Sequence, residues 1–133
     1  MSKSAIYTAM ITPTAVAIGG LIPLGTTIRR FGQNIVQDGN TITVTGAGYY
    51  KVSVSITVAP TAVGSVGATL LKDGVSVSGA LSSSSVSTAN NPTTLGIEAI
   101  VRNTCDCDSS ILSLMLTTTG SNVLNTAVTV EKI

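Results

Sequence analysis

Apolar and polar residues alternate along most of the chain, and the alternation is clearest in TGAGYYKVSVSITVAP, residues 45–60. One parity of this segment is apolar: Tyr50, Val52, Val54, Ile56 and Val58. The other parity is polar: Lys51, Ser53, Ser55 and Thr57. Successive side chains of a β-strand point to opposite faces of its sheet. The segment is therefore predicted to form a strand with one face on a core and the other toward water or a polar partner surface.

Segments of this kind recur about every ten residues and are bounded by turn residues. Val, Ile and Thr are common throughout, and no apolar stripe has the spacing of an α-helix. We therefore predict an all-β chain of roughly eight to ten strands. Besides the segment above, strands are predicted at residues 5–11, 40–46, 65–74, 75–81, 93–103, 110–118 and 125–133.

Turn residues divide these strands and organise them into one domain. Asp73-Gly74 is a dipeptide typical of tight hairpins, whereas the Pro- and Gly-containing stretch that ends at Gly25 is predicted to pair only partly. The polar segment SSSSVSTANNP, residues 82–92, is predicted to be an exposed loop. Neither half beside this loop has enough strands to close a core alone. Residues 1–133 are therefore predicted to form a single domain.

Two predicted strands are apolar on both parities. In ILSLMLT, three leucines form one face, while Ile111 and Met115 lie on the other. In LGIEAIV, Ile100 lies behind the apolar face, next to Glu98 and Arg102. A strand that is apolar on both faces is predicted to be buried on both faces. The cover is either another subunit or a long loop of the same chain, and the pattern leaves both alternatives open.

Length and composition allow a sizeable core. The chain has 133 residues, of which 44% are hydrophobic and 10% charged, so it needs no disulfide or metal to fold. The net charge of +1 is spread along the chain, which disfavours nucleic acid and anionic membranes as partners. No apolar run approaches the roughly 20 residues of a membrane span. The first residues lack the unbroken apolar region of a signal peptide, so we expect synthesis in the cytosol without export by that route.

IRRFG, residues 28–32, contains the only adjacent basic pair. A solvated or ion-paired turn is the simple interpretation of so short a cluster. The functional interpretation is that Arg29 or Arg30 pairs with Glu98, or with an Asp, across a subunit contact.

The sequence offers little for catalysis. Histidine is absent, which excludes the commonest general base and the usual nucleophile triads. No nucleophile elbow, P-loop or dinucleotide-binding glycine pattern occurs. The six carboxylates do not stand out as a pair on separate strands. We therefore predict that the protein is not an enzyme and has no organic cofactor.

The order of several segments resembles the C1q and tumour-necrosis-factor-like superfamily of compact jelly rolls. The segments are AIYTA, GAGYYKVSVSITV, ATLLKDGVSV, LGIEAIVRN, ILSLMLT and TAVTVEKI, and together they cover nearly the whole chain. The small bacterial and phage members are the most similar, including phage structural proteins and the C-terminal domains of collagen-like surface proteins. The resemblance implies a compact two-sheet jelly-roll sandwich.

The resemblance also implies a homotrimer whose subunits pack edge to face around a threefold axis. Candidate residues for the trimer interface are Tyr49, Tyr50, Ile100, Ile111 and Met115. For each of them, simple burial in the core of one subunit is the alternative. The chain departs from better-known members in having one Phe, no Trp and no collagen-like Gly-x-y stalk. An aromatic-rich seam or a receptor groove is therefore not expected.

TCDCDSS, residues 104–110, is the one stretch that suggests chemistry at a site. Near a threefold axis, Cys105, Asp106, Cys107 and Asp108 from three copies would be able to bind a metal ion or cross-link subunits on oxidation. The two aspartates alone would suit calcium. Free thiols in a loop are the simpler alternative, because a disulfide across one intervening residue is strained.

These inferences favour a structural or adhesive module. The first hypothesis is a trimeric jelly roll displayed on a phage virion, as a capsid decoration or a fibre knob, or on a bacterial particle surface. Its partners would be further copies of itself and other virion or surface proteins. The alternative is a module that binds a carbohydrate or host-surface receptor through its end loops or the grooves between subunits.

Overall fold

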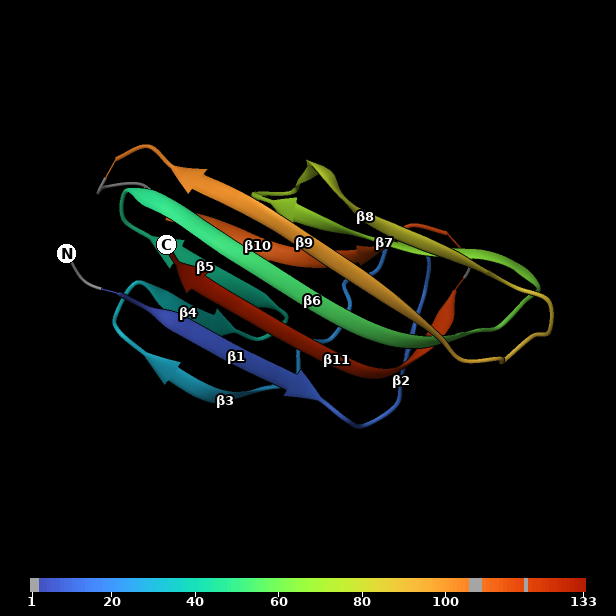
Figure 1. Cartoon of the computed structure of the whole chain (residues 1–133). Coiled ribbons are helices and arrows are strands. Elements are labelled where there is room, and N and C mark those ends of the chain that lie inside the picture. The colour runs from blue at the N-terminus through green and yellow to red at the C-terminus, as the bar shows by residue number, and fades with distance from the viewer. Residues whose placement is uncertain (1–2, 106–108, 119) are drawn as a thin grey trace.

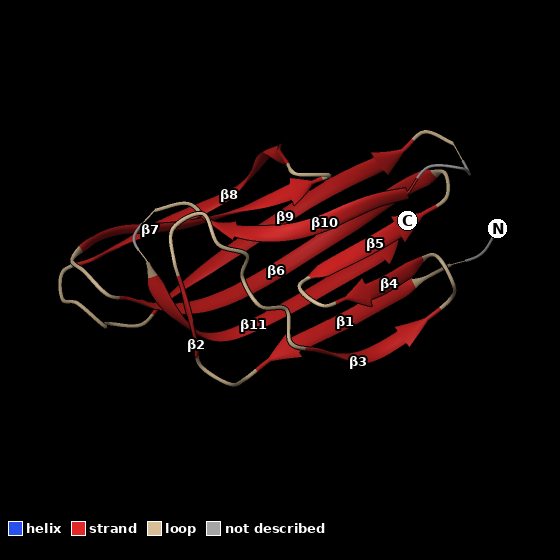
Figure 2. Cartoon of the chain, turned by 180° about the vertical axis from the view of Figure 1, so that it is seen from behind, coloured by secondary structure: helices blue, strands red, loops and turns tan. Residues whose placement is uncertain are grey.

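The computed structural model describes residues 3–105, 109–118 and 120–133. The regular structure of these residues is entirely β, in two antiparallel sheets (Figures 1 and 2). No helix of membrane-spanning length and hydropathy occurs among them. The strands are β1 (Ala5–Met10), β2 (Thr14–Val16), β3 (Thr26–Phe31), β4 (Ile35–Asp38), β5 (Thr41–Thr45), β6 (Gly48–Pro60), β7 (Gly64–Lys72), β8 (Val75–Val86), β9 (Thr93–Asn103), β10 (Ser109–Leu116) and β11 (Ser121–Lys132).

The two sheets pack face to face, and distant parts of the sequence pair within each. The first sheet has the order β3-β1-β11-β6-β9, with β2 paired to one end of β11. The second sheet has the order β4-β5-β10-β7-β8. In each sheet the middle strand of the five comes from the C-terminal part of the chain (Figure 1). The fold is therefore complete only when the last two strands are in place.

Strand β6 confirms the prediction for the segment that alternates most clearly. Its apolar parity is buried between the sheets, and its polar parity faces away from the core. β6 pairs with β9 on one side and β11 on the other for almost its full length. The register of β6 with these two neighbours therefore shows which residues of β9 and β11 face outward.

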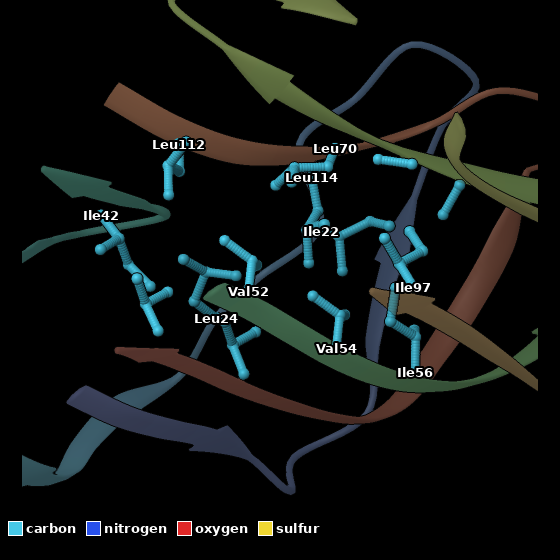
Figure 3. Packing of buried hydrophobic residues seen from close by; sticks show 14 of the residues in the cluster. Ile22, Leu24, Ile42, Val52, Val54, Ile56, Leu70, Ile97, Leu112 and Leu114 are labelled. Atoms are coloured by element: carbon cyan, nitrogen blue, oxygen red, sulfur yellow. The ribbon is translucent and has the colours of Figure 1, made fainter. Parts of the chain in front are cut away.

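The core lies between the sheets and includes side chains from a connecting segment (Figure 3). Ile22 and Leu24 belong to the link between β2 and β3, yet both are fully buried. In Figure 3 they lie among Val52 and Val54 of the first sheet and Leu114 of the second. Full burial of an aliphatic side chain stabilises a fold by about 1.5–3 kcal/mol. This link therefore acts as part of the core rather than as a surface loop.

The predicted hairpin turn at Asp73-Gly74 is confirmed. Both residues have positive φ, 54° and 83°, as the favoured two-residue hairpin turn requires. The Asp73 carboxylate also accepts a hydrogen bond of 2.9 Å from the backbone N–H of Ile111. The Asp73 N–H in turn donates to the Ile111 carbonyl at 2.8 Å. These two bonds fasten the β7–β8 turn to β10.

The predicted loop at residues 82–92 is wrong in its first half. Residues 82–86 continue β8 and pair with β7, from Ser82 opposite Ala68 to Val86 opposite Gly64. Serine has a low intrinsic preference for strands, but β8 is an edge strand beside a largely buried β7, and long-range pairing outweighs that preference. The hydroxyl groups of Ser84 and Thr93 lie 2.9 Å apart and join β8 to β9.

The strands run lengthwise, so their connections gather at two poles (Figure 1). At one pole the start of β1 and the end of β11 lie together, because the backbone N–H of Lys132 donates to the Ser4 carbonyl at 2.9 Å. At the other pole the β6–β7 and β8–β9 links lie together, with the N–H of Asn90 donating to the Pro60 carbonyl at 2.7 Å. The termini and these links are thus at opposite ends of the molecule.

Candidate interaction surface

The outward side of the first sheet, which we call the first face, is formed by alternate residues of β3, β1, β11, β6 and β9. Its cross-strand rows follow from the register. One row runs from Phe31 through Ala5, Glu131 and Lys51 to Ile100. A second row runs from Arg29 through Tyr7, Thr129 and Ser53 to Glu98. The corresponding side of the second sheet is called the second face.

Small residues hollow out the middle of the first face. Ser53, Ser55, Gly96 and Ala127 line a shallow depression, with Glu98 at its rim. Thr129 lines this depression and also a second one, which is formed by Tyr7, Arg29 and Phe31 near β3. The two depressions therefore adjoin across the sheet. A surface of this shape can receive protruding side chains of a partner.

Large apolar side chains are exposed toward both edges of the first face. Near β3 these are Tyr7 and Phe31, the second of which is 61% exposed. Near β9 they are Tyr49 and Ile100, at 50% and 59%. The Arg102 guanidinium lies over the Tyr49 ring, 5.5 Å from its centroid, in the range of a cation–π contact. Apolar groups that gather on one face beside charged groups are typical of an interaction surface.

A groove runs beside the first face, where the edge strands β8 and β9 approach each other. Val75, Val77 and Ile100 supply apolar lining, and Lys72 and Arg102 supply positive charge. The Lys72 ammonium donates a hydrogen bond of 2.8 Å to the Arg102 carbonyl and so bridges the two sheets. The groove combines aliphatic surface with two cations.

The structure separates the five residues predicted for the trimer interface. Tyr49 and Ile100 lie exposed on the first face. The prediction for Tyr50 is wrong, because its side chain is 0% exposed within a single chain. The Tyr50 hydroxyl donates to the carbonyls of Thr45 and Gly46, at 2.8 and 3.0 Å. Neighbouring residues of a strand point to opposite faces, so two adjacent tyrosines cannot both face a partner.

Ile111 and Met115 lie on β10, in the second sheet, and so on the opposite side of the molecule from Tyr49 and Ile100. One flat contact between subunits therefore cannot include both Tyr49 and Ile100 and the two residues of β10. Met115 is partly buried within the chain, and its backbone forms an antiparallel bridge with Leu21 of the β2–β3 link. Ile111 remains 47% exposed. Cover by the same chain, the alternative left open for the doubly apolar strands, therefore accounts in part for β10 but not for β9.

The cysteine motif lies largely outside the described residues. Residues 106–108, and with them Asp106, Cys107 and Asp108, are among those that the structure does not describe. Cys105 follows β9 and is disulfide-bonded, so the simpler expectation of a free thiol is wrong for this residue. The chain bends at Cys105, which departs from the extended geometry that holds alternate side chains apart. Within the described part of the chain, no three potential metal ligands gather. The metal site remains a prediction.

Sequence reasoning missed the contribution of β3. The basic pair Arg29-Arg30 is in a strand and not a turn, and its two side chains diverge. Arg29 faces outward beside Tyr7, whereas the Arg30 Nε donates to the Ile35 carbonyl at 2.7 Å. The signal in the sequence was Tyr7, which has the opposite parity to the buried Ile6 and Met10.

Two antiparallel sheets with this strand order define a jelly roll of the C1q and tumour-necrosis-factor-like type. Murine APRIL superposes with a TM-score of 0.75 at 10% identity, covering 99% of this chain and 100% of that one. The globular domain of the zebrafish complement 1qA protein gives 0.71 at 8% identity, with 97% and 95% covered. The PRD1 vertex protein P5 gives 0.63 at 14% identity, with 98% and 96% covered.

No protein-family model matches the chain, and no curated protein matches it by sequence. At identities of 8–14%, the structural similarity shows the fold alone. The predicted fold class and the resemblance to this superfamily, phage members included, are confirmed.

Proposed function

We propose that the protein is a non-enzymatic jelly-roll module that associates with copies of itself and is displayed on a virion or a similar particle. The first face carries this proposal. Exposed apolar side chains, adjoining depressions and charged groups lie together on it, in a fold that the PRD1 vertex protein shares. Such a surface is suited to binding another protein surface rather than a small molecule.

The proposed assembly is a homotrimer, as the resemblance to C1q and tumour-necrosis-factor-like proteins implies. Association through the first face would bury Tyr7, Phe31 and Ile100, which a single chain leaves in water. The protein would be made in the cytosol and carried on a particle assembled there. A chain without histidine is in keeping with a role in building and display.

The mass of the purified protein tests the association. Light scattering is expected to give about 40 kDa, three times the 13.4 kDa of one chain, with and without reductant. A mass of 13.4 kDa in both conditions would contradict the trimer. A trimer that is lost only in reductant would instead make Cys105 the basis of the assembly. Immunolabelling of intact particles tests display, and particles that lack the protein would contradict that part of the proposal.

A second candidate is recognition of an acidic glycan on a host surface. The groove between β8 and β9 favours it, because Lys72 and Arg102 line the groove together with aliphatic side chains. Binding on a glycan array that is lost in Lys72→Gln and Arg102→Gln would support this function. Binding that both variants retain would exclude the groove.

A further inference from the structure

Two opposite charges stand at the two edges of the first face, in the same cross-strand row. Arg29 on β3 begins the row and Glu98 on β9 ends it, with β1, β11 and β6 between them. Four inter-strand spacings of about 4.8 Å place their Cα atoms about 19 Å apart. Within one chain the two side chains are thus too far apart to form an ion pair. Both are exposed, and neither contacts another described residue through a hydrogen bond or ion pair.

The surroundings of the two charges complement each other as well. Arg29 lines one depression together with the exposed aromatic residues Tyr7, its cross-strand neighbour, and Phe31. Glu98 lies at the rim of the depression of small residues, and the exposed Ile100 is next on the same side of β9. One patch thus offers a cation with exposed aromatic side chains. The other offers a carboxylate, an aliphatic side chain and a hollow.

We propose that Arg29 of each copy pairs with Glu98 of the next copy, so that the β3 patch of one subunit packs on the β9 patch of its neighbour. This inference rests on the proposed self-association and names the contact that directs it. Because the two patches differ, the contact runs head to tail, and repeated contacts close into a ring when the rotation allows it. The aromatic and aliphatic groups supply burial, while the charge pair sets which patches meet.

Charge reversal provides the test. Arg29→Glu and Glu98→Arg each place like charges at every contact of the ring, and each is expected to reduce the mass from about 40 kDa to the 13.4 kDa of one chain. The double variant R29E/E98R restores opposite charges at every contact, and it is expected to regain the wild-type mass. Asp38→Lys is the matched control, because Asp38 is exposed on the second face and its reversal leaves the first face unchanged.

Mixing the two single variants adds a test that depends on the number of subunits. Every contact between an R29E copy and an E98R copy joins opposite charges, so a two-fold dimer would be fully satisfied by the mixture. A ring of three contains at least one contact between identical copies and therefore one pair of like charges. The mixture is expected to recover far less assembly than the double variant. Recovery to the same extent would overturn the pairing in a ring of three.

The outcomes separate this inference from the proposed function. If the wild type is a single chain in solution, the self-association itself fails. If the wild type is a trimer and both single variants keep its mass, the association stands and the Arg29–Glu98 contact is overturned. A double variant that remains dissociated overturns the contact as well. Far-UV circular dichroism checks that each variant is folded, and if a reversal does not fold, Arg29→Gln and Glu98→Gln are expected to weaken the assembly several-fold.

Discussion

Both outward faces of the sandwich are formed by the outward-facing, alternate residues of their strands. The two faces differ in the types of residue at these positions. The first face carries five charged residues: Arg29, Lys51, Glu98, Arg102 and Glu131. On the second face, Asp38 is the charged residue among those that the structure describes, and hydroxyl groups predominate: Thr41, Thr43, Thr45, Ser83 and Ser85. Exposed tyrosine and phenylalanine likewise occur on the first face, as Tyr7, Tyr49 and Phe31.

This difference shows where recognition is encoded in a plain β sequence. The buried residues of the strands are mostly Val, Ile and Leu, because their main role is to fill the core. The outward parity is free to vary, and it concentrates charge and exposed aromatic rings on one side. A hydroxyl-rich face suits exposure to water, whereas the first face has the features of a contact surface.

The largest expected effect comes from obstructing the hollow of the first face. Gly96→Arg places a long side chain there. A Cβ at this position would lie 3.9 Å from the Val54 carbonyl oxygen, an ordinary van der Waals distance, so the fold tolerates it. We expect dissociation to single chains in light scattering. Ser85→Arg makes the same change on β8, the edge strand of the second sheet, and should leave the mass unchanged. Equal masses for both variants would remove the distinction between the faces.

A smaller effect is expected from the tyrosine pair, whose members face opposite ways. Tyr50→Phe removes buried hydrogen bonds to two carbonyls and should lower the free energy of unfolding by about 1.5 kcal/mol. Tyr49→Phe changes an exposed side chain and should alter stability by less than about 0.5 kcal/mol. Urea unfolding at one fixed protein concentration measures both, since association shifts apparent stability. A larger loss for Tyr49→Phe would contradict the assignment of the two faces.

The smallest effect is a gain. The hydroxyl groups of Thr8 and Thr126 are buried on the inner side of the first sheet without a hydrogen-bond partner among the described residues. Thr126→Val removes a polar group that burial disfavours, and it should raise the free energy of unfolding by about 0.5–1 kcal/mol without changing the assembled mass. Thr43→Val, on the outward side of the second sheet and away from the first face, is the control. A loss of stability in Thr126→Val would show that its hydroxyl has a partner.

Local patterns were sufficient to predict much of the fold. The strand predicted at 93–103 has those same bounds in β9, and the Asp73-Gly74 turn was visible as a dipeptide. The extension of β8 through residues 82–86 was not predictable in this way, because four serines in a row are typical of a loop and only pairing with β7 makes them a strand. Long-range pairing of this kind is not written in any short segment.

The interaction surface was predicted less well, for the same reason. Alternation identified Ile100 and Met115 alike as apolar residues on the outer parity. Whether such a residue stays exposed depends on segments far away in the sequence: the Leu21 bridge reaches Met115, whereas Ile100 remains open. The possible pairing of Glu98 with an arginine across a contact was suggested by the sequence, but its place on the face required the register of five strands.

The start of β1 and the end of β11 lie at the same pole, and this gives the domain a direction. A cargo fused before Ser4 or after Ile133 would leave from the same end, and in a ring of three it would form a cluster of three tethers around one axis. The links at residues 61–63 and 87–92 would then point away from the cargo, at the end where insertions leave the paired strands untouched. In a fusion protein the sandwich would then act as a spacer, and a sequence grafted into either link would be held at the end of the domain opposite the cargo.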